Sequence, residues 1–191
     1  MNSRPDHLGG GENRCHTDPG SVAYMKSQFD IKTMLDVGCG RGGQVQVGID
    51  LGIDSVGVDG DVWESNKFWG ELPIIAHDYI TGPCPDLSGK SFDLVWSVEF
   101  LEHVEEKYIP NFMIDFQRGK YVICTFAPPG KAGNHHVNCN TVEYWEDKFA
   151  SYGFRLDWGL SNTIRAKSTM KKYFMKDNGL VFVNENSTDL S

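Results

Sequence analysis

The chain has 191 residues and a formal net charge of -8, which together fix its size class and limit its partners. A chain of this length favours one domain and excludes a two-domain enzyme. Hydrophobic residues make up 40% and aromatic residues 12%, which is enough for a packed core and too much for a disordered chain. The chain has 26 acidic and 18 basic residues. This excess of negative charge disfavours nucleic acid as a partner, because proteins bind the phosphate backbone mainly through positively charged side chains.

The sequence shows neither an export signal nor a membrane segment. No apolar run approaches the roughly 20 residues that a bilayer-spanning helix needs, and the start of the chain is polar and glycine-rich. The five cysteines form no CxxC pair, so we expect reduced thiols and no zinc knuckle. These features predict a cytoplasmic protein with no membrane partner.

Short runs rich in β-branched and aromatic residues alternate with longer mixed segments along the chain. This pattern is typical of a parallel sheet whose strands are joined by helices. The predicted strands are residues 33–37, 55–58, 74–77, 92–97, 121–126, 154–156 and 180–183. The sequence therefore predicts an α/β fold with a doubly wound, seven-stranded sheet.

Two helices are expected among the early strands. Residues 44–51 alternate apolar and polar side chains as a strand would. We nevertheless predict a helix there, because a glycine loop precedes the segment and a strand follows it. Asp61 and Glu64 are suited to begin a second helix over residues 62–69.

The second half of the chain carries clearer helical signals. Apolar residues at i, i+3, i+4 and i+7, with Pro110 in the first turn, predict a helix over residues 109–116. Asn140 is placed to cap a helix over residues 141–152. The lysine-rich segment 166–176 is predicted as a basic helix, either a solvated face or a surface that attracts an anionic substrate.

The most informative stretch is Thr33-Met-Leu-Asp-Val-Gly-Cys-Gly-Arg-Gly-Gly43, in which a strand runs directly into closely spaced glycines. Glycine permits a tight turn and lets main-chain N–H groups approach a ligand, and the following helix offers its positive end. Gly38, Gly40 and Gly43 satisfy GxGxxG, whereas Gly38, Gly40 and Gly42 satisfy GxGxG. The glycines therefore favour a nucleotide-like ligand but do not identify the cofactor. A tight turn that binds no ligand is the alternative interpretation.

Acidic residues stand at the ends of three successive predicted strands. Asp36 precedes the glycines, where a carboxylate suits a cationic ammonium better than a pyrophosphate. Asp59 ends the second strand, the position of a ribose-hydroxyl acceptor. Asp78 follows the third strand, where it could accept the exocyclic amine of adenine beside Tyr79. Either of the last two residues could instead begin a turn, but the three together predict a pocket for adenosine joined to an amino acid.

At this point the sequence resembles the class I S-adenosylmethionine-dependent methyltransferases, over residues 33–183. The segments that carry the resemblance are Leu35-Asp-Val-Gly-Cys-Gly-Arg-Gly42, Val58-Asp59, His77-Asp78 and Phe92-Asp-Leu-Val-Trp-Ser-Val-Glu-Phe-Leu-Glu-His103. The last segment resembles the small-molecule version of the family. The resemblance implies a methyltransferase with S-adenosylmethionine as cofactor and a mostly parallel, Rossmann-like sheet. The strand at residues 179–183 would then run antiparallel beside the fifth strand.

The resemblance also implies that Gly38, Gly40, Asp59 and Asp78 hold the cofactor, with main-chain groups around Ser97 and Val98 beside the sulfonium. Together with the neighbouring residues, the expected cofactor-binding set is Asp36, Gly38, Cys39, Gly40, Asp59, Gly60, Asp78, Tyr79, Ser97 and Val98. Small stand-alone domains of this kind resemble enzymes encoded among bacterial and phage accessory genes, which would place a phage-encoded protein in the host cytoplasm.

Departures from the family pattern bear on the acceptor. Arg41 stands where a small residue or proline is more frequent, which affects only the local shape of the loop. Enzymes that methylate base amines commonly carry an Asn-Pro-Pro-Tyr type sequence after the fourth strand, whereas this chain has Ser97-Val-Glu-Phe100. The Ala127-Pro-Pro-Gly130 segment follows the fifth strand instead. We therefore expect a small-molecule, sugar or glycan acceptor, methylated at oxygen or nitrogen, with a nucleic acid acceptor as the alternative.

Histidines supply the candidate base. His135 and His136 end a glycine- and proline-rich loop after the fifth strand, and strand ends are where ligands bind in open α/β sheets. Histidine titrates near neutral pH and is suited to remove a proton from a hydroxyl or ammonium group. His103 is a further candidate. For each histidine the alternative is structural, as it is for Glu102.

Other functions and sites remain as alternatives. His135, His136, Cys139 and Glu102 are metal-ligand types, but their spacing matches no metal motif, so we expect no metal. A nicotinamide-dependent oxidoreductase shares the glycine pattern, and a cofactor-binding module without turnover would share the fold. We expect a flexible segment or lid over residues 1–20, the methyltransferase domain over residues 21–185 and a polar tail over residues 186–191. The segment Cys15–Gly20 could cover the cofactor or form an ordinary turn.

Overall fold

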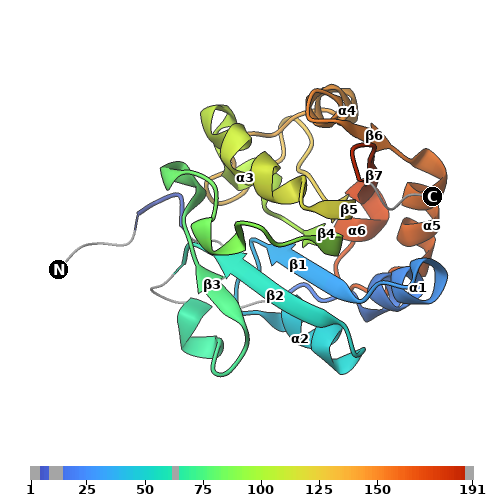
Figure 1. Ribbon diagram of the computed structural model, residues 1–191. Coiled ribbons are helices and arrows are strands. Elements are labelled where there is room, and N and C mark those ends of the chain that lie inside the picture. Colours follow the sequence, from blue (N-terminus) through green and yellow to red (C-terminus); the bar gives the residue numbers. More distant parts are fainter. Residues whose placement is uncertain (1–4, 9–14, 62–64, 188–191) are drawn as a thin grey trace.

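A single sheet in the order β3-β2-β1-β4-β5-β7-β6 organises the computed structural model, which describes residues 5–8, 15–61 and 65–187 (Figure 1). Its strands are β1 Thr33–Val37, β2 Asp54–Asp59, β3 Ile74–Ala76, β4 Phe92–Ser97, β5 Gly119–Cys124, β6 Phe154–Leu156 and β7 Leu180–Asn184. The predicted strands and fold class are confirmed. The largest shift is at β5, which begins and ends two residues before the predicted bounds.

The direction of the last strand also agrees with the expectation. Strands β3, β2, β1, β4 and β5 pair in parallel. β7 runs antiparallel to both β5 and β6, so that Tyr121 pairs with Val183 and Phe154 with Asn184. The chain order reverses between β1 and β4, and ligands of open α/β sheets bind at such a switch point.

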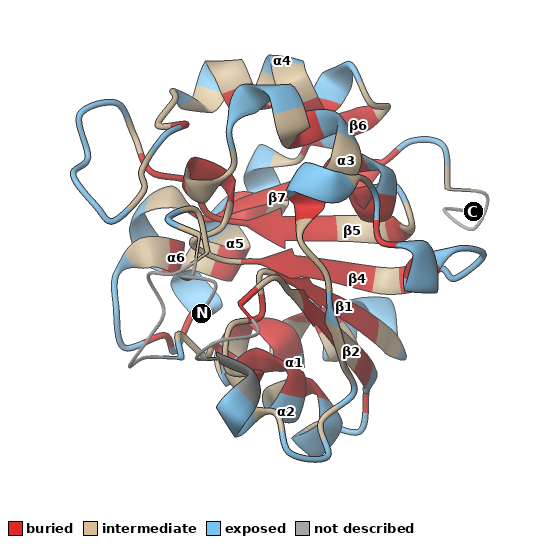
Figure 2. Cartoon of the chain, turned by 90° about the vertical axis from the view of Figure 1, so that its left-hand side faces the viewer, coloured by how far each residue is buried: buried red, intermediate tan, exposed pale blue. Residues whose placement is uncertain are grey.

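Helices cover both faces of this sheet. They are α1 Pro19–Phe29, α2 Gly43–Asp50, α3 Ile109–Phe116, α4 Val142–Ala150, α5 Trp158–Lys167 and α6 Phe174–Asn178. Figure 2 shows α3 and α4 above the sheet and α1 and α2 below it. In the part of the chain that the structure describes, no helix has the length and apolar character needed to span a bilayer.

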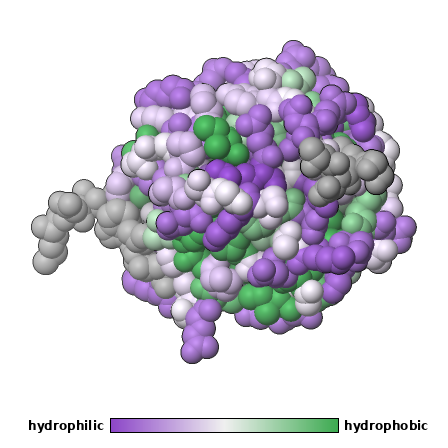
Figure 3. All heavy atoms as spheres, in the orientation of Figure 1, coloured by the Kyte–Doolittle hydropathy of each residue, from purple (hydrophilic) through white to green (hydrophobic). Residues whose placement is uncertain are grey.

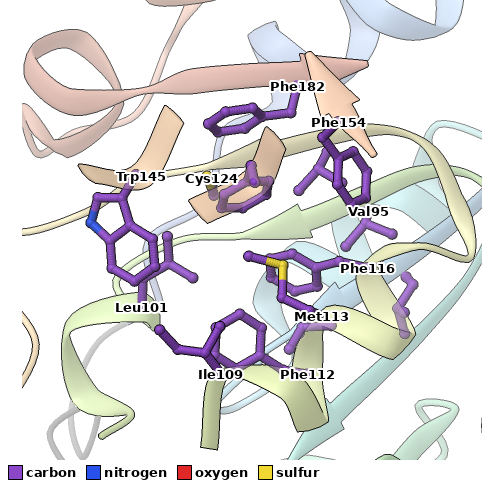
Figure 4. Close-up of a cluster of buried hydrophobic side chains, with 14 of the residues drawn as sticks. Val95, Leu101, Ile109, Phe112, Met113, Phe116, Cys124, Trp145, Phe154 and Phe182 are labelled. Atoms are coloured by element: carbon purple, nitrogen blue, oxygen red, sulfur yellow. The ribbon is translucent and has the colours of Figure 1, made fainter. Parts of the chain in front are cut away.

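The strands supply both layers of the core because successive side chains point to opposite faces of a sheet. Leu94 and Trp96 face the side of α1, α5 and α6, whereas Val95 faces α3 and α4. Figure 4 shows the cluster on the side of α3 and α4, to which Phe112 and Trp145 from the helices and Phe182 from β7 all belong. Burial on both faces explains why the central strands read as continuous apolar runs.

The distribution of polar and apolar residues agrees with a core on both faces of the sheet. Figure 3 shows hydrophilic residues over much of one face of the molecule, with apolar residues gathered mainly low in the view. The largest fully buried side chains include Trp96, Trp145, Phe112, Phe116 and Phe149. The large aromatic residues that the composition supplies are therefore used mainly inside the two clusters.

Two predicted helices differ from the structure by more than a residue or two at their ends. Residues 62–64 of the helix predicted over 62–69 lie outside the described residues, and residues Ser65–Phe68 form a 3₁₀ helix. The basic segment 166–176 is not one helix, because α5 ends at Lys167 and α6 begins at Phe174. Between them the backbone N–H of Thr169 donates to the Asp18 carboxylate, a tertiary contact that replaces a helical hydrogen bond.

The capping residue of α4 is also different from the expectation. Thr141, and not Asn140, precedes the first helical residue, and its hydroxyl oxygen accepts a hydrogen bond from the N–H of Tyr144 at 3.3 Å. The Asn140 side chain instead donates to Asn138. Asn140 therefore stabilises the preceding loop and not the helix end.

We expect Thr141→Ala to lower the free energy of unfolding by about 1 kcal/mol, because an N–H in the first turn of α4 loses its acceptor. Urea denaturation followed by circular dichroism measures this change. Asn140→Ala is the neighbouring control and should cost less, about 0.5 kcal/mol or below. A larger loss of unfolding free energy for Asn140→Ala than for Thr141→Ala would show that Asn140 is the capping residue, as the sequence predicted.

Candidate active site

A cavity of about 330 Å³ opens at the carboxyl edge of the sheet, over the switch point between β1 and β4. The loops that follow β1, β2, β3 and β4 all contribute to its walls, together with the loop before α4. The volume lies within the range of ligand pockets in proteins. Residues from both predicted groups, the cofactor-binding residues and the histidines, therefore line one continuous space.

The glycine loop after β1 forms the floor of this cavity. Gly38, Gly40 and Gly42 have φ angles of +74°, +52° and +80°, a region that other residues adopt only with strain. A side chain at Gly38 would collide with Phe100. At Gly40 a Cβ would meet nothing within 4 Å, so the bare main chain there faces open space. This loop offers the close main-chain approach that a nucleoside ligand requires.

Two of the strand-end acids stand side by side at the glycine loop. Asp36 is only 3% exposed, and burial, reinforced by the charge of Asp59, raises the pKa of its carboxyl group well above the ordinary value. Asp59 accepts hydrogen bonds from the N–H groups of Gly40 at 2.7 Å and Asp61 at 2.8 Å. Because two nearby carboxylates repel each other, the pair favours a ligand that brings positive charge.

Asp78 lies at the next strand end and is engaged in a different way. Its carboxylate accepts from the N–H of Ile80 and lies 2.8 Å from Nε2 of His7. His7 and Leu8 line the same cavity, and Leu8 packs on Gly60. The sequence did not reveal the contact between His7 and Asp78, because nothing local relates residues so far apart in the chain.

Other predicted cofactor residues line the cavity, with one exception. Cys39, Gly60, Tyr79 and Val98 contribute to its walls. The Tyr79 ring is 5% exposed and packs edge-on against His77 and Phe100, so it forms a wall of the cavity. Ser97 is fully buried, and its hydroxyl donates to the carbonyl oxygen of Val37. The Ser97 side chain therefore ties β4 to β1 and does not line the cavity.

All three candidate histidines reach the cavity. His103 lies in a short 3₁₀ helix, Leu101–His103, after β4, and His135 and His136 lie in the loop before α4. His135 has a positive φ of 50°, and its buried Nε2 has no hydrogen-bond partner. Strained backbone of this kind concentrates at functional sites. Nδ1 of His136 donates to the carbonyl oxygen of Lys131 at 3.0 Å.

The segment Cys15–Gly20 divides between two roles. Cys15 and His16 line the cavity. Asp18 caps α1 through the N–H of Ser21 and fixes the chain where α1 begins. Part of the segment therefore borders the cavity. The Asp-Pro-Gly sequence forms the cap and the first turn of α1, and not the ordinary turn that was the alternative. The role of residues 1–20 as a lid stays a prediction, with residues 1–4 and 9–14 outside the described part of the chain.

The structure agrees with what the resemblance to the class I S-adenosylmethionine-dependent methyltransferases implies. It has a doubly wound sheet with an antiparallel seventh strand, a glycine loop after β1 and acids at the next strand ends. Residues 35–118 match the family model described as "Methyltransferase domain". These residues form a methyltransferase domain, and its cofactor is S-adenosylmethionine. The match favours methyl transfer over the nicotinamide-dependent alternative.

Solved structures with the same fold include several methyltransferases. A SAM-dependent methyltransferase from Archaeoglobus fulgidus has a TM-score of 0.53 at 22% identity, covering 70% of this chain and 67% of its own. A TehB-like methyltransferase from Corynebacterium glutamicum has a TM-score of 0.61 at 18% identity, covering 86% and 87%. Magnesium protoporphyrin IX methyltransferase from Synechocystis, with bound S-adenosylhomocysteine, has a TM-score of 0.56 at 15% identity, covering 84% and 78%. A search of the curated proteins finds no significant match.

Proposed function

We propose that this methyltransferase transfers a methyl group to an oxygen or nitrogen atom of a small-molecule or glycan acceptor, with His135 as the base. One observation carries the proposal. The cavity lined by the glycine loop and the strand-end acids is also lined by the loop histidines. Donor and acceptor must meet in one space for an in-line transfer, and this cavity offers such a space.

The cofactor half of the proposal rests on the fit of the residues at the glycine loop. S-adenosylmethionine carries an ammonium group and a sulfonium whose methyl group is transferred while sulfur retains the electron pair of the broken bond. Asp36 is suited to bind positive charge, because its buried carboxylate lies beside the loop and is destabilised without a cation. The open space at Gly40 accommodates a ligand against the main chain. Asp59 and Asp78 offer acceptors for ribose hydroxyls and the adenine amine.

The catalytic half rests on His135. Its Nε2 is buried without a partner in a residue that lines the cavity, so it has an unused position for the acceptor proton. His136 is less suited to this task, because its Nδ1 is already committed to Lys131. In the proposed reaction the acceptor atom forms the new bond to the methyl carbon. The acceptor proton passes to Nε2 of His135.

The cavity and the net charge bear on the class of acceptor. The cavity of about 330 Å³ lies in the range of sites that take small molecules, which supports a small-molecule acceptor. One similar structure is named for a small-molecule acceptor, magnesium protoporphyrin IX. The acidic net charge of -8 disfavours a nucleic acid acceptor.

Transfer of label from methyl-labelled S-adenosylmethionine tests this function. The protein is incubated with a small-metabolite extract, a glycan fraction and total nucleic acid in separate reactions. We expect label in the metabolite or glycan fraction, and label in nucleic acid alone would contradict the proposed acceptor class. His135→Ala should lower the rate about 100-fold or more, because general-base catalysis contributes factors of this size.

Binding measurements separate loss of catalysis from loss of fold. Calorimetry should give the same S-adenosylhomocysteine affinity for His135→Ala and the unmodified protein. Lys131→Ala removes an exposed side chain from the same loop and should keep the full rate. An unchanged rate in His135→Ala would remove this residue from the mechanism.

A further inference from the structure

We propose that Glu102, His103 and His136, with Glu99 beside them, form a divalent cation site that holds the acceptor oxygen. One ligand atom from each of the first three residues lies within 4.8 Å of the other two. Ligands on opposite sides of one ion lie about 4.2 Å apart when the bonds are about 2.1 Å long. A small inward movement of these side chains would therefore bring all three onto one ion.

The set differs from the one weighed on sequence alone. That set contained Cys139 and His135, whereas the structure brings His103 into the cluster. The His103 and His136 rings stand edge to face with centroids 5.0 Å apart. Cys139 lies behind the cluster, with its sulfur 3.7 Å from Nδ1 of His136.

Backbone hydrogen bonds hold the two halves of the cluster together. The carbonyl oxygen of Glu102 accepts from the N–H groups of Val137 at 2.9 Å and Asn138 at 3.1 Å. The Asn138 side chain also donates to the carbonyl oxygen of Val104 at 3.0 Å. These bonds fix the loop that carries His136 against the helix that carries Glu102 and His103.

The imidazole of His136 is oriented as a metal ligand requires. Its Nδ1 donates to the carbonyl oxygen of Lys131, so the neutral ring leaves its lone pair on Nε2. A hydrogen bond of this kind from the second ring nitrogen is the usual support of a ligating histidine. Gly133 packs against the ring, and a side chain at that position would collide with Nε2.

The buried carboxylate in this cluster accepts no hydrogen bond that would stabilise its charge. Glu102 is fully buried, and neither of its carboxylate oxygens has a hydrogen-bond partner. Nδ1 of His103 is likewise buried without a hydrogen-bond partner. A divalent cation would supply the missing positive charge.

Glu99 completes the cluster from the end of β4. Its backbone has a φ of +55°, unusual for a residue with a side chain, and its carboxylate accepts from the hydroxyl of Thr125 at 3.0 Å. Residues with such backbone angles concentrate at functional sites. Oxygen ligands suit magnesium and manganese, whereas imidazole suits zinc and iron, so a set of carboxylates and imidazoles points to a metal such as Mn²⁺.

The role of the cation rests on the proposed methyl transfer. His103 and His136 line the same cavity as Val98 and the glycine loop, so the ion would lie beside the donor. A hydroxyl oxygen bound to the ion becomes more acidic and is held in place for attack on the methyl carbon. Its proton then passes to Nε2 of His135. The cation therefore favours an oxygen acceptor over a nitrogen acceptor.

Binding of Mn²⁺ to the full chain tests the site without any acceptor. Electron paramagnetic resonance follows the loss of the free Mn²⁺ signal during titration. We expect about one ion bound per chain, with the affinity lowered at least tenfold in Glu102→Gln and in His136→Ala. His135→Ala and Cys139→Ser are neighbouring controls that should keep the affinity of the unmodified protein. Circular dichroism and S-adenosylhomocysteine calorimetry show whether each variant is folded.

Several outcomes would overturn the site. They are absence of Mn²⁺ binding, an unchanged affinity in a folded His136→Ala variant, and an equal loss in His135→Ala. The role of the ion is tested by chelation, which should abolish label transfer and leave S-adenosylhomocysteine binding intact, with transfer restored by added Mn²⁺. Full transfer in the presence of chelator would refute this role alone. Mn²⁺ binding without any transfer to an acceptor would support the site and contradict the proposed function.

Discussion

Asp36→Asn should weaken S-adenosylhomocysteine binding about thirtyfold, because a hydrogen bond to a charged group contributes about 2 kcal/mol. The same substitution should leave the ligand-free protein at neutral pH more stable than the unmodified one. Asp36 is 3% exposed, and its carboxylate is disfavoured by burial and by Asp59. Asparagine keeps the shape of the side chain and removes the charge, so binding and stability should change in opposite directions.

The pH dependence of stability gives an independent check on Asp36. Its pKa is raised in the folded protein, so the folded state retains the proton more strongly than the unfolded state does. The stability that this difference contributes is full below the ordinary value of 3.8 and is lost as the pH rises through the folded pKa. The advantage of Asp36→Asn should therefore be smallest in acid and should grow as the pH increases.

Calorimetry measures the affinity, and urea denaturation at several pH values measures the free energy of unfolding. Asp54→Asn is a matched control, because Asp54 is an exposed residue at the opposite end of β2 from the cavity. It should change neither quantity appreciably. An Asp36→Asn variant that binds as tightly as the unmodified protein would show that this carboxylate does not contact the cofactor.

Local patterns in the sequence were sufficient for the sheet and the cofactor loop. Each central strand is buried on both faces, so it appears in the sequence as an apolar run, and the run ends where the chain turns at the carboxyl edge. The positive φ angles of Gly38, Gly40 and Gly42 are requirements that the sequence states directly through glycine. Asp59 and Asp78 then follow from their positions after strands.

Features that depend on contacts between distant segments could not be predicted. Asn140 and Thr141 are both capping residue types, and only the turn geometry assigns the cap to Thr141. The segment after α5 is pulled away from helical geometry by its contact with Asp18, which lies 151 positions away in sequence. His103 and His136 are likewise brought together by backbone hydrogen bonds across two loops, which no spacing rule describes.

Gly38→Ala should lower the free energy of unfolding by about 3 kcal/mol, from the sum of two effects. The φ of +74° is strained for alanine, which costs about 1 kcal/mol or more. The added methyl carbon would lie 2.6 Å from the Phe100 ring, and overpacking of this kind costs about 1 to 3 kcal/mol. Phe100 packs in turn against Tyr79 and Phe112, so the ring has little freedom to move aside.

Gly40→Ala is the matched variant, since it adds the same methyl group two residues along the same loop. Its φ of +52° brings a similar strain, but its Cβ meets nothing within 4 Å, so the loss of stability should stay near 1 kcal/mol. Its effect should appear in binding instead, because the methyl group projects into the space where the main chain approaches the cofactor.

Urea denaturation measures the loss of stability in both variants, and S-adenosylhomocysteine calorimetry measures the loss of affinity. Equal destabilisation by the two variants would mean that Phe100 moves away from Gly38, and unchanged affinity in Gly40→Ala would mean that the cofactor does not pass over this glycine.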